Sequence, residues 1–210
     1  MTRYYPLMLK LEGAACVVVG GGAVAQRKVS GLLESGSAVT VISPAVTERL
    51  ELMATRGELV LHRRAYRAGD LQGARLVFAA TDDPGINRQV ASEADRLSIP
   101  VNVADDPESG SFVTPATVRR GDLVLSVTAS GASPMLASRI RQELEARYGP
   151  EYERLTAWLR ELRRRVQQQG QPADVRRRML ERALELPEAW WQPEQSEESW
   201  AQLLDQLRLT

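Results

Sequence analysis

The stretch Cys16-Val17-Val18-Val19-Gly20-Gly21-Gly22-Ala23-Val24-Ala25-Gln26-Arg27-Lys28 decides the fold of this chain. A β-branched apolar run stops at three glycines and continues with apolar residues at helical spacing, which predicts a strand, a tight turn and a helix. Gly20, Gly22 and Ala25 occupy the three glycine positions of the dinucleotide-binding fingerprint. The first permits the turn, the second lets a pyrophosphate approach the backbone, and the third keeps helix and strand close. A dinucleotide is therefore expected at the amino end of this helix.

The residues that follow complete the strand–helix–strand context that the fingerprint requires. A second strand is predicted over 38–42, and it ends at Ser43-Pro44-Ala45. The fingerprint expects an acidic residue there for the ribose. Ser43 is able to hydrogen-bond a ribose hydroxyl, but the usual argument for NAD over NADP is absent, so NAD is a preference. The alternative is a turn that binds no ligand.

Strands and helices alternate through the rest of the first half. Further helices are predicted over 45–56 and 84–97, and further strands over 58–63, 75–80 and 99–104. This order predicts an α/β fold with a Rossmann-type parallel sheet, whose ligands lie beyond the carboxyl ends of the strands. We therefore expect four segments to converge at one edge of the sheet: residues 20–22, Ser43, residues 81–83 and Asp105-Asp106. Residues 7–11 alternate and predict a short strand or edge segment that leads into the first main strand.

The pattern changes after residue 110. Strands predicted over 111–118 and 122–128 flank Arg119-Arg120-Gly121, which indicates an antiparallel hairpin. Ser133 and Pro134 then predict the start of a helix that ends near Tyr148. The chain from residue 151 has helical spacing, with a break at 167–172 and another at 190–193 before a last short helix. We therefore divide the chain into a Rossmann domain over 1–111, a hairpin–helix segment over 112–148 and a helical domain over 149–210.

Composition excludes several classes of protein. The 27 basic and 27 acidic residues cancel, so no net field attracts nucleic acid or an anionic membrane. Cys16 is the only cysteine and His62 the only histidine, which excludes an internal disulfide, a cysteine zinc cluster and a multi-histidine metal site. The chain shows no leader pattern and no apolar run of membrane-spanning length. We expect a cytoplasmic protein without a resident metal.

The predicted edge of the sheet carries carboxylates and hydroxyls. A carboxylate beside a nicotinamide suits dehydrogenation, because the carboxylate accepts a proton while the cofactor accepts a hydride. Asp105 and Asp106 are the candidates for that base, and each is equally well explained as a cap of the turn before Pro107. Lys28, in the first turns of the nucleotide helix, is expected to face phosphate or substrate acids.

The motifs, in their order, closely resemble the siroheme-synthase N-terminal family, whose members are precorrin-2 dehydrogenases and in some cases also sirohydrochlorin ferrochelatases. The resemblance covers residues 4 to 148. It rests on five motifs: residues 20–28, Ala79-Ala80-Thr81-Asp82-Asp83 with Asn87, Asn102-Val103-Ala104-Asp105, residues 111–116 and Ser130-Gly131-Ala132-Ser133-Pro134.

The resemblance implies an enzyme that oxidises precorrin-2 to sirohydrochlorin with NAD, using Asp105 as the acid–base residue. It implies a homodimer formed through residues 112–148. The implied cofactor-binding residues are Gly20, Gly22, Ala23, Val24, Ser43, Pro44, Ala45, Thr81 and Asp82. Because precorrin-2 is a polycarboxylate, the candidate substrate contacts are Arg27, Lys28, Arg119, Arg120, Ser130 and Ser133.

Two alternatives to a dehydrogenase alone stay open. A bifunctional enzyme would also insert Fe²⁺ into sirohydrochlorin with the same carboxylate, and the single histidine favours dehydrogenation alone. A non-catalytic Rossmann module that senses NAD would normally keep the acidic residue after the second strand and lack the 130–134 loop. With 210 residues, we expect no methyltransferase domain on the same chain.

Overall fold

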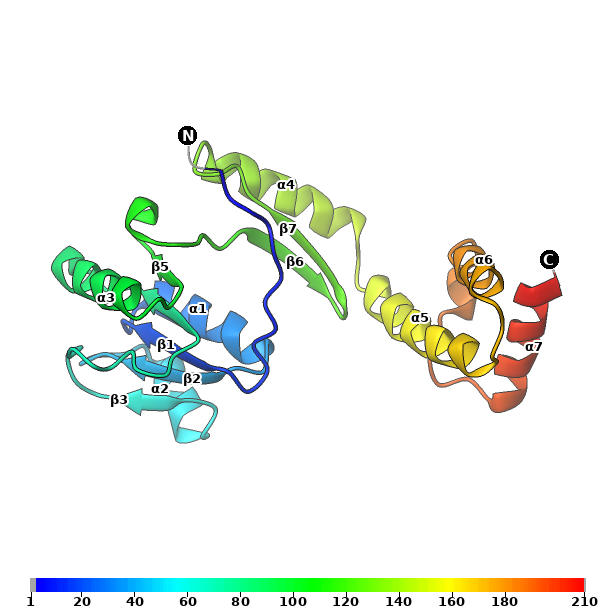
Figure 1. Ribbon diagram of the computed structural model, residues 1–210, viewed down its shortest axis with the longest axis horizontal. Helices are drawn as coiled ribbons and strands as arrows, with labels where there is room; N and C mark the ends of the chain where they lie inside the picture. The colour runs from blue at the N-terminus through cyan, green and yellow to red at the C-terminus, as the bar shows by residue number, and fades with distance from the viewer. Residues whose placement is uncertain (1–2, 210) are drawn as a thin grey trace. The chain divides into compact units, whose positions relative to one another are not determined.

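The computed structural model describes residues 3–209, so Met1, Thr2 and Thr210 of the predicted first and last domains lie outside the described residues (Figure 1). The chain divides into two compact units, Met1–Thr114 and Pro115–Thr210. The three-part division at residues 111 and 148 stays a prediction. In the described chain, no helix combines the length and the apolar character that a bilayer crossing requires.

The first unit is built on a five-stranded parallel sheet with the order β3-β2-β1-β4-β5. From β1 the chain moves outward to β3 and then returns to the centre at β4, so the strand order reverses between β1 and β4. This arrangement confirms the predicted Rossmann-type α/β fold. The strands are β1 (Ala15–Val19), β2 (Ala38–Ile42), β3 (Val60–His62), β4 (Leu76–Ala79) and β5 (Val101–Val103).

Three helices bury both faces of this sheet. Successive side chains of β1 point to opposite faces, so Cys16 and Val18 join one core cluster while Val17 and Val19 join the other. The first cluster includes the buried faces of α1 and α2, and the second includes the buried face of α3. Burial on both faces explains why the strands read as continuous apolar runs. The helices are α1 (Ala23–Glu34), α2 (Glu48–Thr55) and α3 (Pro84–Arg96).

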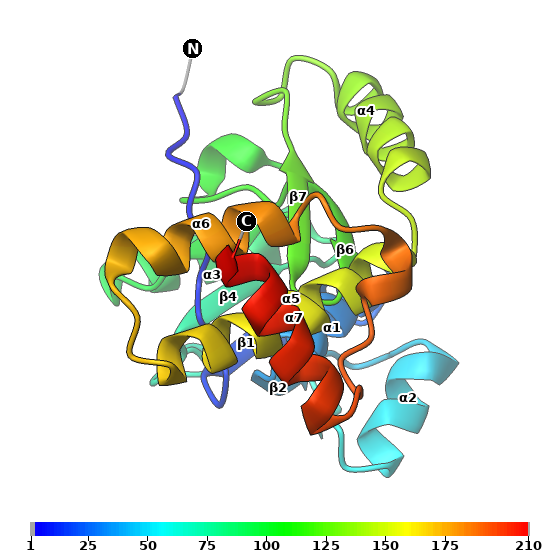
Figure 2. The same cartoon turned by 90° about the vertical axis from the view of Figure 1, so that its right-hand side faces the viewer.

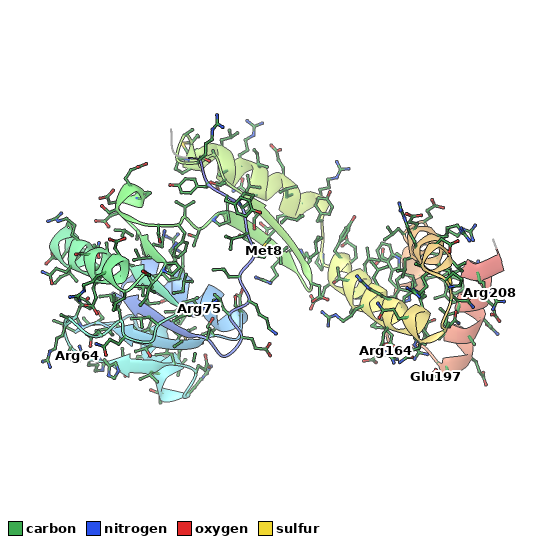
Figure 3. The ribbon with its side chains drawn as sticks, in the orientation of Figure 1. Met8, Arg64, Arg75, Arg164, Glu197 and Arg208 are labelled. Carbon is green, nitrogen blue, oxygen red and sulfur yellow. The ribbon has the colours of Figure 1, made fainter. Side chains whose placement is uncertain are left out.

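The prediction of a leading strand over residues 7–11 is wrong. These residues belong to neither sheet, and the side chain of Met8 is 72% exposed (Figure 3). Alternation alone does not make a strand, because a strand also needs a neighbouring edge that takes its backbone hydrogen bonds.

Two other predicted elements begin later than expected. Residues 111–115 are not a strand, because the Ser111 N–H donates to the Val101 carbonyl and Pro115 has no N–H to offer a ladder. The second helix begins at Glu48, because the Thr47 hydroxyl accepts from the Leu50 N–H and acts as its N-cap.

The second unit combines the predicted antiparallel hairpin with four α-helices. In its helical core the rings of Trp158 and Trp200 stack with centroids 6.2 Å apart, and α6 packs against both α5 and α7 (Figure 2). The Arg165 guanidinium lies 4.9 Å from the Trp200 ring centroid and pairs with Glu197 at 2.6 Å. The elements are β6 (Ala116–Arg120), β7 (Leu123–Val127), α4 (Pro134–Arg147), α5 (Glu151–Gln168), α6 (Ala173–Ala183) and α7 (Glu197–Leu209).

A buried carboxylate on α3 fixes the long connection between β3 and β4. Glu93 is 5% exposed, and its two oxygens accept from the Tyr66 hydroxyl and from the N–H groups of Gly69 and Leu71. Burial, together with the neighbouring carboxylate, raises the pKa of Tyr66, so the phenol stays a donor. Three donors replace the water that this carboxylate loses on folding.

Replacing Tyr66 with Phe leaves the Glu93 carboxylate one donor short and should lower the stability of the first unit by roughly 1–3 kcal/mol. The matched control is Tyr5→Phe, since Tyr5 is 85% exposed. Urea unfolding of both variants measures the difference. Equal stabilities for the two variants would show that the hydrogen bond from Tyr66 to Glu93 adds nothing to the free energy of unfolding.

Candidate functional site at the carboxyl edge of the parallel sheet

The glycine turn between β1 and α1 is shaped by two close backbone approaches. Gly20 has φ +128°, and a Cβ placed on it would lie 2.2 Å from the Ala80 carbonyl oxygen in the loop after β4. A Cβ on Gly21 would lie 1.9 Å from the carbonyl oxygen of Ala45. Both positions therefore require glycine for reasons internal to the fold.

Gly22 differs from its two neighbours. It is the N-cap of α1 with φ −80°, and a Cβ on it would meet nothing within 4 Å. No side chain caps this helix, and its first turn carries no acidic residue. Gly22, Ala23 and Val24 are exposed. This helix end offers open space, uncapped N–H groups and the positive end of a helix dipole, which together fit a dinucleotide pyrophosphate.

The loop after β2 is bound to the same turn. The Thr47 N–H donates to the Gly21 carbonyl at 3.0 Å, and its hydroxyl donates to Gln26 of α1 at 2.7 Å. Ser43 is buried, and its hydroxyl donates to the Ala45 carbonyl at 2.6 Å, so its proton is used within the loop. Pro44 and Ala45 are exposed beside the turn. The loop predicted to hold the ribose is thus adjacent to the glycine turn.

One buried amide joins the loops after β4 and β5. Asn87 on α3 is 1% exposed, and its Nδ2 donates to Asp105 Oδ1 at 2.8 Å and to the Thr81 carbonyl at 3.2 Å. Its Oδ1 accepts from the Thr81 N–H at 3.2 Å and from the Thr81 hydroxyl at 2.7 Å. Thr81, a predicted cofactor residue, and Asp105, the predicted base, therefore share one partner.

The four aspartates of these loops differ in their hydrogen bonds and exposure. Asp83 is the N-cap of α3 and accepts from the Gly85 and Ile86 N–H groups. Asp106 Oδ2 accepts from the Ser109 hydroxyl at 2.5 Å and so holds the turn that Pro107–Ser109 forms. Asp105 is exposed and its carboxylate is directed to Asn87, outside that turn. Asp82 is exposed, next to Thr81.

Lys28 is half-buried on α1 and lies over Phe78 of β4. Its Nζ donates to the Thr114 hydroxyl at 2.5 Å and lies 5.3 Å from the Phe78 ring centroid. Burial, and secondarily the nearby charge of Arg27, lowers the pKa of Lys28. Arg27 itself is exposed. In the described part of the chain no carboxylate pairs with Lys28.

Four of the predicted substrate contacts belong to the second unit. The Arg120 Nε donates to the Tyr148 carbonyl at 3.1 Å, and its NH2 lies 3.8 Å from a Glu145 oxygen, so it closes the carboxyl end of α4. The Ser133 hydroxyl accepts from the Leu136 N–H and caps the start of α4, as predicted. Ser130 has φ +50°, and Arg119 lies on β6.

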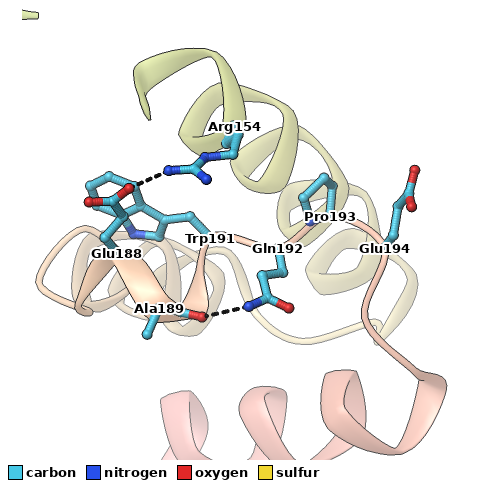
Figure 4. Close-up of a pocket in the computed structure, with 7 residues that line it drawn as sticks. All are labelled: Arg154, Glu188, Ala189, Trp191, Gln192, Pro193 and Glu194. Atoms are coloured by element: carbon cyan, nitrogen blue, oxygen red, sulfur yellow. Dashed lines mark hydrogen bonds and ion pairs between the residues drawn. The ribbon is translucent and has the colours of Figure 1, made fainter. Parts of the chain in front are cut away.

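A hollow of about 790 Å³ in the second unit contains none of the predicted site residues (Figure 4). It is lined by Trp191 and by the ion-paired Arg154 and Glu188, together with Ala189, Gln192, Pro193 and Glu194. Within residues 3–209 no three His, Cys, Asp or Glu side chains are grouped so that they could hold a metal ion.

Sequence reasoning missed the role of Asn87 at this edge. The signal was present, since Asn87 is a polar residue on the helix face that also carries Ile86, Val90 and Ala94, which pack in the core. A polar side chain on a buried face needs partners, and its partners here are functional candidates.

Residues 7–116 match a protein family described as "Putative NAD(P)-binding", and the chain belongs to this family. The family and the glycine turn together define a nicotinamide dinucleotide-binding protein, in which NAD and NADP are not distinguished.

The chain is similar to proteins named siroheme synthase. It is 40% identical to that of Methylococcus capsulatus over 186 residues, which are 89% of this chain and 39% of the relative. It is 46% identical to that of Pseudomonas entomophila over 143 residues, 68% of this chain and 31% of the relative. The chain thus spans between three and four tenths of the length of these two relatives. These matches confirm the resemblance seen in the motifs.

A solved structure titled "SirC, precorrin-2 dehydrogenase" matches the whole fold. Its TM-score is 0.76 at 27% identity, and the match covers 99% of this chain and 100% of that one.

The two outer glycines of the turn should respond differently to alanine. Gly20→Ala places a methyl group against the Ala80 carbonyl at a positive φ and should cost roughly 2 kcal/mol or more. Gly22→Ala meets open space and should cost about 1 kcal/mol at most. Thermal unfolding of the pair measures both effects, and a stable Gly20→Ala protein would contradict the close approach described here.

Proposed function

We propose that this protein is an NAD-dependent precorrin-2 dehydrogenase, which forms sirohydrochlorin in siroheme biosynthesis. The observation that carries the proposal is the position of Asp105: an exposed carboxylate at the same sheet edge as the open glycine turn, free of the turn that Asp106 holds. The names of the similar proteins, siroheme synthase and precorrin-2 dehydrogenase, give the substrate class.

The residues of the glycine turn fit the dinucleotide. Gly22, Ala23 and Val24 would hold the pyrophosphate on the N–H groups of α1, Pro44 and Ala45 would border the ribose, and the Thr81 loop would border the nicotinamide. When bound, the cofactor supplies a hydride acceptor. We infer NAD rather than NADP, because residues 43–45 contain no basic side chain for a 2′-phosphate.

Asp105 performs the proton chemistry in this proposal. Oxidation of precorrin-2 removes two hydrogens, one as a hydride and one as a proton, and the ionised Asp105 carboxylate takes the proton. Its Oδ1 is held by Asn87, which leaves the second oxygen to face the substrate. The exposure of Asp105 gives a large macrocycle access to that oxygen.

Basic side chains supply the contacts for a polycarboxylate. Lys28 is the best placed of them, because it is a cation at the sheet without a carboxylate partner in the described chain. Arg27, Arg119, Ser130 and Ser133 stay predictions as substrate contacts. Arg120 closes the end of α4, so a contact from it would compete with that bond.

Three further predictions from the sequence complete the proposal. We expect a homodimer formed through residues 112–148, a segment whose Met135 and Leu136 side chains are 83% and 50% exposed. We expect a cytoplasmic location. Iron insertion into sirohydrochlorin remains the alternative second activity. It would be established if the protein, incubated with sirohydrochlorin and Fe²⁺, inserted iron faster than a protein-free control.

The proposed base is tested with Asp105→Asn. The variant keeps an oxygen for the Asn87 amide but no basic carboxylate, so kcat for NADH formation from precorrin-2 should fall about 10²–10⁴-fold. NAD⁺ affinity, measured by calorimetry, should stay unchanged. Asp106→Asn is the matched control and should keep its activity, because an amide oxygen still accepts from Ser109. Wild-type turnover by Asp105→Asn would show that the Asp105 carboxylate is not the base.

The cofactor position is tested with Gly22→Asp. Aspartate is a favoured N-cap, so thermal stability should be retained or rise. The new carboxylate would occupy the space assigned to the pyrophosphate, and NAD⁺ affinity should fall at least about tenfold, a loss of about 1.4 kcal/mol. Gly22→Asn has the same size without the charge and separates steric from electrostatic loss. Unchanged affinity in Gly22→Asp would place the dinucleotide elsewhere.

A further inference from the structure

The side-chain amide of Asn87 uses every hydrogen-bonding position that it has. Its two N–H groups are donated to Asp105 Oδ1 and the Thr81 carbonyl, and its oxygen accepts from the N–H and the hydroxyl of Thr81. Four hydrogen bonds are the full capacity of an amide side chain. Asn87 is 1% exposed, so its amide group is shielded from bulk water.

Only one orientation of this amide satisfies its neighbours. If the oxygen and nitrogen exchanged places, the oxygen would face the Asp105 carboxylate and the NH₂ group would face the Thr81 N–H. Both contacts would then be repulsive, and buried groups would lose their partners. The surrounding groups therefore fix the orientation of the amide in which its NH₂ group donates to Asp105.

The helix that carries Asn87 is itself firmly held. Asp83 caps its first turn, and the Asn87 N–H donates to the Asp83 carbonyl at 3.1 Å. One turn further on, Val90 is completely buried in the core cluster of this sheet face. A rigid helix thus supports a side chain of fixed orientation, which in turn contacts two irregular loops.

We propose that Asn87 is a positioning residue, which fixes the Asp105 carboxylate relative to the Thr81 loop and so relative to the nicotinamide. This inference rests on the proposed function, in which Asp105 is the base and Thr81 borders the cofactor. A hydrogen bond from a neutral amide orients a carboxylate through one oxygen and transfers no proton to it, so the second oxygen stays available to the substrate. Small displacements of a reacting group cost about 10²-fold in rate.

The variant Asn87→Asp removes the donor side of the amide and keeps its acceptor side. An oxygen remains for the N–H and hydroxyl of Thr81, but the NH₂ group that serves both Asp105 and the Thr81 carbonyl is replaced by a carboxylate oxygen that repels them. We expect kcat to fall about 10²-fold while the dissociation constant of NAD⁺ stays within about threefold of the wild-type value. A purely structural role would instead change stability and NAD⁺ affinity together and leave kcat unaffected.

The matched control is Val90→Ala, which weakens α3 by a core cavity without touching a polar group. It should lower the unfolding temperature and keep the wild-type kcat. If Val90→Ala lost as much kcat as Asn87→Asp, the effect would belong to helix stability and the positioning role would be overturned.

A measurement on the protein without cofactor tests the contact itself. Scalar coupling across the hydrogen bond should connect the Asn87 side-chain nitrogen with the Asp105 carboxyl carbon in an isotope-labelled wild-type sample. Its absence would overturn the proposal, even if the variants did not fold. Wild-type protein that shows the coupling but does not oxidise precorrin-2 would instead refute the proposed function, while a fully active Asn87→Asp would refute only the positioning role.

Discussion

The approach of Gly20 to the Ala80 carbonyl is the constraint on which the site depends. It occurs where the strand order reverses, between β1 and β4, and it leaves no room for a Cβ. Because of this contact the start of α1 lies beside the loop that follows β4, at the same sheet edge as the end of β5. Open α/β sheets bind ligands at such a reversal. The open space above Gly22 and the carboxylate of Asp105 are consequences of that geometry.

The polar residues at this edge divide into those that build it and those left free to act. Three of them hold the structure together: Asp83 caps α3, Asp106 accepts a hydrogen bond within a turn, and Ser43 donates one within its loop. Asp105 accepts a hydrogen bond from Asn87 through one oxygen and remains exposed. The likeness to siroheme synthases and to a precorrin-2 dehydrogenase agrees with an edge that combines an uncapped helix end with the exposed carboxylate of Asp105.

Much of the fold could be predicted because its signals are local. The first helix, predicted directly after the glycine turn, is observed over Ala23–Glu34, since Gly22 starts it and Gly36, with φ +73°, ends it. Residues 7–11 could not be predicted correctly, because their alternation says nothing about a neighbouring edge. The chemistry of the residues alone left the roles of Asp105 and Asp106 open, since adjacent carboxylates cap turns equally well, and the family resemblance was what favoured Asp105. The bond from Arg120 to Tyr148 crosses 28 residues and has no local signal.

A crystal structure of the wild-type chain with NAD⁺ would show whether the glycine turn and Asp105 form one site. We expect the pyrophosphate on the N–H groups of Gly22, Ala23 and Val24, with the nicotinamide ring turned toward Asp105 and space for a macrocycle between them. A dinucleotide bound in the hollow beside Trp191, or a nicotinamide ring directed away from Asp105, would contradict it.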